Sequence, residues 1–247
     1  MDLKELESGV DPKTHWYYQS KKVPMMRFFN KVIKAQQKPI TIVDFGAGSG
    51  FFALEILEEY PDHVEKVLLV DINYSETELA VSKGKKVEKL HFVPEGLENC
   101  IVLMMDVLEH IEDHFGIYGD LFNRLGANSY FFITVPAFMG LWSGHDVYLG
   151  HFRRYTRKTL LELVKSQPVN LENCYYIYGG IFPLAWGVRK LKNLTGKGKN
   201  EMPDQSDMGN VPEFVNTLLR NYNSMEMKLL SNNKIAGLTC VAEGQIK

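Results

Sequence analysis

Short apolar runs along the first half of this chain alternate with segments whose apolar residues recur at helical spacing. Each run ends close to a glycine, an acid or a proline, and such bounded apolar runs are typical of buried parallel strands. The predicted strands are 40–45, 66–71, 87–93, 100–105 and 129–135. The predicted helices between them are 51–60, 74–82 and 112–125. Alternation of this kind predicts βαβ crossovers, and therefore an α/β fold with helices on both faces of a mostly parallel sheet.

The second half of the chain is less regular. Residues 136–155 show no periodicity but hold several aromatic residues, two histidines and two arginines, and a loop of that length is usually functional or mobile. The elements predicted after it are a helix capped by Thr156, a strand at 169–178, helices at 179–194 and 213–231, and a last strand at 235–242. The sheet is therefore predicted to have seven strands, with a C-terminal helical insertion at 179–212. The part at 195–212 is rich in Gly, Lys, Asn, Asp and Pro and is predicted to be flexible.

Composition and charge exclude several classes of protein. The 247 residues suffice for one α/β domain, and Lys plus Arg (28) nearly balance Asp plus Glu (30), for a formal charge of −2. A surface this balanced does not suit a long polyanion, so nucleic acid is not an expected partner. The polar opening MDLKELESG predicts no secretory leader, and no run reaches the roughly 18 apolar residues of a spanning helix. Cys100, Cys174 and Cys240 predict reduced, buried thiols of a cytoplasmic protein.

A glycine-rich turn follows the first predicted strand. The segment VDFGAGSG at 43–50 places Gly46, Gly48 and Gly50 between a strand and a helix. Glycines let a backbone turn sharply and let a ligand approach the main chain, and a helix N-terminus offers free N–H groups to an anion. The dinucleotide fingerprint G-x-G-x-x-G fails here, because neither starting glycine places a glycine at the last position.

An acid at the end of the second predicted strand completes the motif. Asp71 stands 25 residues after Gly46, and a carboxylate there can accept two hydrogen bonds from ribose hydroxyls. The pattern D-x-G-x-G-x-G followed by this acid resembles motif I of class I methyltransferases, which have a Rossmann-like fold and use S-adenosylmethionine. In that family the glycine loop holds the methionine part of the cofactor and the acid holds its ribose. The cofactor-binding residues that the resemblance implies here are Asp44, Gly46, Ala47, Gly48, Gly50, Asp71 and Ile72.

The segment LMMDVLEHIE includes the end of the fourth predicted strand. Its D-V-L-E-H element resembles methyltransferases related to the ubiquinone and small-molecule O-methyltransferases, and implies that Asp106 and Val107 contribute to the methionine pocket. In some relatives the same position has E-x-x-E-H and binds a divalent metal, and the RNA enzymes among them add a later histidine. This implies a Mg²⁺, Mn²⁺ or Zn²⁺ site at Glu109, His110 and His151, although Asp106 replaces the first glutamate and is one methylene shorter. A hydrogen-bonded helix start at Glu109 and His110 is the alternative.

The aromatic, basic loop carries the candidate acceptor site. The sequence VPAFMGLWSGHDVYLGHFRRYT at 135–156 resembles a bacterial methyltransferase subgroup with a V-P-A-F…W-S-x-H-D…G-H-x-R-R-Y signature, whose members commonly occur among genes for surface-glycan and lipid-linked saccharide assembly. His145 or His151 is the candidate general base, with Asp146 orienting an imidazole. Arginines bind phosphate or carboxylate in bidentate fashion, and aromatic rings can stack on sugars. The candidate acceptor-binding residues are Trp142, Arg153, Arg154 and Tyr155. A packed loop whose histidines and arginines satisfy backbone groups is the alternative.

The resemblance covers nearly the whole chain and predicts one methyltransferase domain over 1–247. Within it, 1–39 forms an N-terminal cap, 40–135 the cofactor-binding half and 136–247 the acceptor-side half. The expected function is methyl transfer from S-adenosylmethionine to an oxygen of a saccharide, a lipid-linked molecule or another small-molecule acceptor. A metal-assisted RNA 2′-O-methyltransferase and a non-catalytic cofactor-binding module are the alternatives.

The segment GGIFPLAWGVRKLKNL at 179–194 has apolar residues at its front and basic residues towards its end. Short apolar helices with basic flanks can lie in a lipid interface, and a polyprenyl-linked acceptor would suit such a peripheral membrane contact. A lid or core helix with a solvated end is the alternative.

Overall fold

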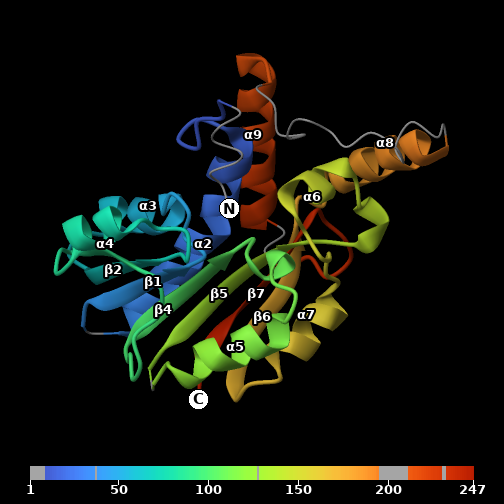
Figure 1. Ribbon diagram of the computed structural model, residues 1–247. Coiled ribbons are helices and arrows are strands. Elements are labelled where there is room, and N and C mark those ends of the chain that lie inside the picture. The colour runs from blue at the N-terminus through green and yellow to red at the C-terminus, as the bar shows by residue number, and fades with distance from the viewer. Residues whose placement is uncertain (1–8, 37, 127, 195–210, 230–231) are drawn as a thin grey trace.

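The fold is built on one mixed seven-stranded sheet (Figure 1). A computed structural model describes residues 9–36, 38–126, 128–194, 211–229 and 232–247. The strands are β1 (Ile40–Phe45), β2 (Val64–Val70), β3 (Val87–Leu90), β4 (Cys100–Met105), β5 (Tyr130–Pro136), β6 (Val169–Ile177) and β7 (Thr239–Ile246). Their order across the sheet is β3-β2-β1-β4-β5-β7-β6.

The strand directions bring most carboxyl ends to one edge of the sheet. β1 pairs in parallel with β2 and β4, β2 with β3, and β4 with β5. β7 runs antiparallel to both of its neighbours, β5 and β6. Every strand except β7 therefore ends at the same edge, which is where ligands bind in open α/β sheets. The predicted α/β fold with a mostly parallel seven-stranded sheet is confirmed.

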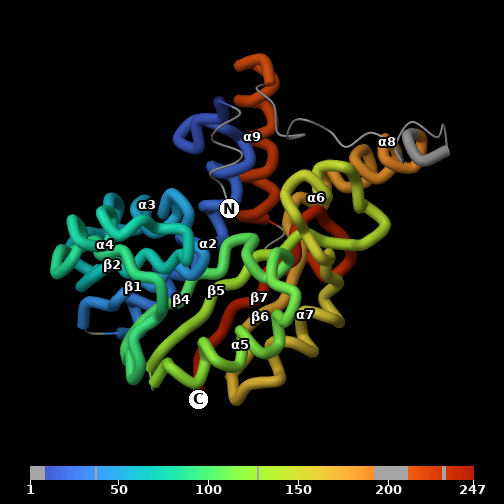
Figure 2. Tube along the Cα trace, in the orientation of Figure 1, coloured from blue at the N-terminus to red at the C-terminus, as the bar shows by residue number. Residues whose placement is uncertain are grey.

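Helices cover both faces of the sheet. They are α2 (Trp16–Ala35), α3 (Phe51–Glu59), α4 (Glu76–Ser82), α5 (His114–Asn123), α6 (Gly144–Leu149), α7 (Arg157–Val164), α8 (Phe182–Leu194) and α9 (Glu213–Leu229). One buried cluster joins α5 and α7 to one face, and a second joins α2 and α3 to the other. Along β4, Val102 and Met104 belong to the first cluster and Leu103 and Met105 to the second, as the two-residue period of a strand requires. Figure 2 shows α9 beside α2, although the two are far apart in the sequence.

The helix α2 is the largest difference from the sequence-based prediction. Over 1–39 we predict only a cap, whereas residues 16–35 form a helix of 20 residues. Pro24 lies inside this helix, and an internal proline removes a helical hydrogen bond and usually breaks the pattern. Burial offsets that cost, because Met25, Phe28 and Phe29 pack into the second cluster on the sheet.

The C-terminal half differs in smaller ways. The last strand runs from Thr239 to Ile246 rather than over 235–242. Its polar end EGQI does not resemble a strand, but β5 and β6 pair with β7 on both sides and so hold it extended. The region 136–155, predicted as a loop, contains a 3-10 helix, η2 (Met139–Leu141), and α6. The other predicted elements are present with bounds shifted by a few residues, and 195–210 of the predicted flexible insertion lies outside the described residues.

The three cysteines are buried thiols without disulfides, as predicted. In the described ranges, no helix is both long enough and apolar enough to cross a membrane.

Glu243 on β7 is a buried titratable acid. Its side chain is 7% exposed, and its Oε2 accepts a hydrogen bond of 3.1 Å from the Tyr175 hydroxyl. Burial raises the pKa of Glu243 from 4.5 to about 7, against the opposing attraction of Arg27. Between these pH values the folded protein binds more protons than the unfolded chain, so the stability of the fold falls as pH rises through this window.

We expect the substitution Glu243→Gln to remove that part of the pH dependence. In the wild-type protein, ionisation of this buried carboxyl costs up to about 3 kcal/mol of unfolding free energy on going from pH 4 to pH 8. Urea unfolding at several pH values measures the difference. Glu58, whose side chain is 71% exposed, provides the control Glu58→Gln, which should leave the slope unchanged. Identical slopes for the wild type and Glu243→Gln would contradict the assignment.

Candidate active site

A cavity of about 610 Å³ opens at the carboxyl edge of the sheet, beside β1, β2 and β4. Its volume lies in the range of small-molecule and cofactor sites. The lining residues come from the ends of these strands, the segments after them, α5 and α6. They are Phe45, Gly46, Val70, Asp71, Ile72, Asn73, His91, Val107, His110, Ile111, Ile117 and Leu149.

The glycine turn between β1 and α3 forms one wall of this cavity. Gly46, Gly48 and Gly50 have φ angles of 72°, 55° and 76°, the left-handed region in which a side chain is strained. A Cβ on Gly46 would lie 2.7 Å from the Val107 side chain, and one on Gly50 would lie 2.7 Å from Leu69. The turn is therefore wedged between the segment after β4 and the strand β2, and only glycine fits these two positions without a shift.

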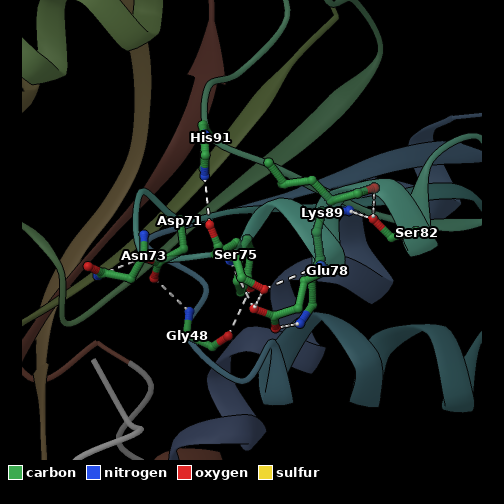
Figure 3. Close-up of polar contacts among 10 residues, drawn as sticks. Gly48, Asp71, Asn73, Ser75, Glu78, Ser82, Lys89 and His91 are labelled. Carbon is green, nitrogen blue, oxygen red and sulfur yellow. Dashed lines mark hydrogen bonds and ion pairs between the residues drawn. The ribbon is translucent and has the colours of Figure 1, made fainter.

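Asp71 joins this turn to the end of β2 (Figure 3). Its Oδ2 accepts a hydrogen bond of 3.0 Å from the Gly48 N–H, and its Oδ1 accepts two from Asn73, at 2.9 and 3.0 Å. The Tyr74 hydroxyl donates to the Gly48 carbonyl at 2.8 Å. A carboxylate has about four acceptor positions, so these contacts leave one for a ligand in the cavity that Asp71 lines.

The remaining predicted cofactor residues divide into two groups. Ile72 and Val107 line the cavity, and the Ile72 side chain is 75% exposed. Asp44 in β1 and Ala47 in the turn are buried and are not among the lining residues. Asp106 follows β4 directly but is not among the lining residues.

Asp106 binds the helix α2 instead. Its φ is 56°, and its Oδ2 accepts hydrogen bonds from the Lys21 ammonium and from the Tyr17 hydroxyl at 2.9 Å. Thr134 on β5 donates to Oδ1 at 3.0 Å. Burial alone would raise the pKa of Asp106, but the Lys21 charge and these hydrogen bonds hold it below its usual value. Since the Lys21 side chain is fully buried, this ion pair fixes α2 to the edge of the sheet.

We expect Lys21→Met to lower the free energy of unfolding by about 3–5 kcal/mol, because it leaves a largely buried carboxylate without its cation. Chemical denaturation measures the loss, and the double variant with Asp106→Asn should recover part of it. The exposed pair Lys13–Glu58 offers the control Lys13→Met, which should cost less than about 1 kcal/mol. A loss at Lys21 no larger than at Lys13 would show that the pair does not hold α2.

Glu109, His110 and His151 form a second group, next to the cavity. One possible ligand atom from each lies within 4.8 Å of the others, and the two imidazole rings are 4.5 Å apart. Glu109 is fully buried, and neither its carboxylate oxygens nor His151 Nε2 has a hydrogen-bond partner. Burial and the nearby Asp106 charge raise the pKa of Glu109 well above its ordinary value. Burial and the nearby His151 lower the pKa of His110 to about 3.

Asp146 sets the orientation of His151. Its Oδ1 lies 2.9 Å from His151 Nδ1, which places the proton on Nδ1 and leaves Nε2 towards Glu109 and His110. Arg154 donates to both Asp146 oxygens at 2.6 and 3.0 Å, and the Ser143 N–H donates at 2.8 Å. Burial alone would raise the pKa of Asp146, but the hydrogen bonds from His151 and Arg154 hold it well below its usual range. A carboxylate behind a histidine in this way is the common support of a metal-binding imidazole.

The other predicted catalytic and acceptor residues have different surroundings. Arg154 uses its donors on Asp146 and on the Ala137 carbonyl, and Arg153 donates to the carbonyls of Ile111 and Glu112. Both guanidinium groups thus have partners within the protein, and their predicted role in binding the acceptor stays a prediction. The list of candidates is completed by His145 on α6, Trp142 after η2, and Tyr155, which is buried with its hydroxyl donating to the Leu108 carbonyl. None of these five residues lines the cavity.

Sequence reasoning missed several residues of the site. Asn73 and His91 follow β2 and β3, and Ile117 and Leu149 lie on helices. Ligands bind at the segments that follow parallel strands. The positions of Asn73 and His91 directly after predicted strands could therefore have identified them as site residues. The contribution of Lys21 had no local signal, because it depends on the packing of α2 against β4 and β5.

Comparisons with known proteins agree with this architecture. A family model described as a methyltransferase domain matches residues 16–173, from the start of α2 into β6. Among solved structures, a chain in the complex of the Haloferax volcanii Trm112 methyltransferase activator with a methyltransferase has a TM-score of 0.50 at 11% identity, over 88% of both chains. The [4+2]-cyclase SpnF has a TM-score of 0.51 at 10% identity, over 89% of this chain and 80% of that one. A SAM dependent methyltransferase from Archaeoglobus fulgidus has a TM-score of 0.48 at 18% identity, over 92% and 94%.

No curated protein sequence matches the chain. At the identities given above, the likeness to solved structures concerns the fold, and the fold is the predicted Rossmann-like one of class I methyltransferases. The family match spans well over half of the 247 residues. The glycine turn, Asp71 and the cavity at the carboxyl edge all lie inside the matched range. This chain therefore belongs to the methyltransferase domain family.

Proposed function

We propose that this protein transfers a methyl group from S-adenosylmethionine, which binds in the cavity beside the glycine turn. The observation that carries the proposal is the cavity itself, whose walls join Gly46 and Asp71 with the apolar side chains of Ile72 and Ile111. The remaining acceptor position on Asp71 suits a ribose hydroxyl, and the apolar wall suits a purine ring. When bound, S-adenosylmethionine supplies an electrophilic methyl group on sulfur.

Substitution of the glycine turn tests the cofactor site. In Gly46→Ala the new Cβ would lie 2.7 Å from Val107 at a φ of 72°. Because Val107 also lines the cavity, relief of this contact would move the cavity wall, and we expect S-adenosylmethionine to bind at least about tenfold more weakly. Isothermal titration calorimetry measures the affinity. Gly140→Ala is the control, since nothing lies within 4 Å of its Cβ position. Equal affinity in wild type and Gly46→Ala would place the cofactor elsewhere.

On the acceptor side we propose His151 as the group that receives a proton. Its Nε2 is free of hydrogen bonds and its ring is held by Asp146, so the ring is oriented to accept a proton from a hydroxyl. The proposed acceptor is accordingly an oxygen of a saccharide, a lipid-linked molecule or another small molecule. Arg154 supports this arrangement indirectly, because it positions Asp146.

As an alternative role for the same imidazole, we propose that Glu109, His110 and His151 bind a divalent cation, in which case His151 Nε2 is a metal ligand and not the proton acceptor. Support comes from the burial of a carboxylate without a partner, which is costly unless it is protonated or paired with a cation. One carboxylate and two imidazoles form a donor set that suits Zn²⁺ or Mn²⁺. A cation there would lower the pKa of an acceptor hydroxyl and so assist its deprotonation. The same set of metal ligands would also suit the alternative function, an RNA 2′-O-methyltransferase. The near-neutral charge of the chain disfavours that alternative.

Thermal unfolding distinguishes a metal site from a buried neutral acid. We expect Zn²⁺ or Mn²⁺ to raise the melting temperature of the wild-type protein, and EDTA to reverse the shift, because a ligand of the folded state stabilises it. Glu109→Gln should lose most of the shift. Without metal, the same variant should be at least as stable as the wild type at pH 8, since the raised pKa of Glu109 means that its ionisation destabilises the fold as pH rises.

The exposed neighbour Glu112 supplies the matched control, and Glu112→Gln should keep the full metal-dependent shift. A wild-type protein whose melting temperature responds to neither Zn²⁺ nor Mn²⁺ would overturn the metal proposal while leaving the cofactor proposal intact.

A further inference from the structure

Exposed apolar side chains gather on the helices α8 and α9. Among the described residues, 19 large apolar side chains are exposed, and nine of these lie on the two helices. Both helices belong to the segment between β6 and β7, and Figure 1 shows them projecting away from the sheet. α8 follows the carboxyl end of β6, and α9 precedes the start of β7, which lies at the same edge. The apolar side chains therefore occur beyond the edge of the sheet on which the cavity opens.

The helix α9 carries an apolar stripe whose side chains are all exposed. Its members are Phe214, Leu218, Tyr222, Met225 and Leu229, with exposures of 78, 57, 41, 55 and 72%. Spacings of four, four, three and four residues place them within an arc of about 80° on the helix. The buried residues Asn223, Glu226 and Met227 lie on the opposite side, where α9 meets the rest of the protein.

The helix α8 has a similar stripe with a basic flank. Leu184, Val188 and Leu191 are spaced by four and three residues and are 72, 45 and 64% exposed. Trp186 is 46% exposed, and the Lys190 ammonium lies 5.3 Å from its ring centroid. The helix sequence FPLAWGVRKLKNL contains basic residues and no acid. At helical spacing Trp186 and Lys190 lie on the side of α8 opposite this stripe, so the helix is amphipathic, with apolar residues on one side and charge on the other.

We propose that these two stripes form one surface that binds the interface of an anionic lipid bilayer. Amphipathic helices with Trp, Phe and Leu on one side and Lys or Arg on the other bind lipid in this way. The exposed Lys190 supplies positive charge for anionic headgroups, whereas Arg189 lies 4.0 Å from the buried Asp146 carboxylate, and a basic residue near such a surface adds attraction. The proposal does not depend on the methyl-transfer proposal, but it would bring the cavity edge to the bilayer, where lipid-linked acceptors are present.

Vesicle flotation of the full chain tests the surface. We expect the wild-type protein to float with vesicles of phosphatidylcholine and phosphatidylglycerol, and less with phosphatidylcholine alone. Binding should fall as salt is added, because charge contributes to it. The double variant Leu184→Glu, Leu218→Glu should reduce the partition coefficient at least tenfold. Val81, which is 62% exposed on α4, supplies the control Val81→Glu, which should float like the wild type.

The variants should keep the melting temperature of the wild type, because all three substituted side chains are exposed. Absence of flotation with both vesicle types would overturn the proposal, as would equal flotation of the double variant. Light scattering of the wild-type protein distinguishes binding to lipid from binding to a second copy of the chain. A dimer that the double variant abolishes, together with no flotation, would assign the surface to a second copy of this chain instead of lipid.

Discussion

The hydrogen bond from the Gly48 N–H to Asp71 joins the ends of two parallel strands, and the shape of the cavity depends on it. The bond spans only 3.0 Å, and it exists because β1 and β2 end at the same edge and the glycine turn has a left-handed backbone. The turn in turn depends on Val107, which leaves no room for a side chain on Gly46. Three strands thus determine one wall of the cavity, the wall against which we propose that the cofactor binds.

A second constraint acts on the other side of the cavity. Burial of the Glu109 carboxylate and of His151 Nε2 without hydrogen-bond partners costs free energy. The His151 ring is held in this orientation by Asp146, which in turn accepts hydrogen bonds from Arg154 and Ser143. Arrangements of this cost are usually found where chemistry needs them. A cation or an acceptor hydroxyl would supply the missing partner, which is why we propose the acceptor side here rather than at the arginines of the loop.

The sequence predicts the sheet well because buried parallel strands are short apolar runs that need no distant information. The glycine turn and Asp71 are also predictable, since backbone geometry restricts which residues can occupy those positions. Predictions fail where tertiary contacts decide. The helix α2 contains Pro24 and forms because its apolar side chains pack on the sheet, and the polar end of β7 is a strand because two neighbours pair with it. The roles predicted for Arg153 and Arg154 at an anion site stay predictions, and in the fold these side chains donate to carbonyls and to Asp146.

The most direct test of the account is the transfer of labelled methyl from S-adenosylmethionine into an extract of the host, separated into lipid, saccharide, RNA and small-molecule fractions. The account predicts label in the lipid, saccharide or small-molecule fraction, and its loss when His151→Ala replaces the wild-type protein. Label in RNA would contradict the proposed acceptor and favour the 2′-O-methyltransferase alternative. Tight binding of S-adenosylmethionine without label in any fraction would contradict the central claim and indicate a cofactor-binding module that does not transfer the methyl group.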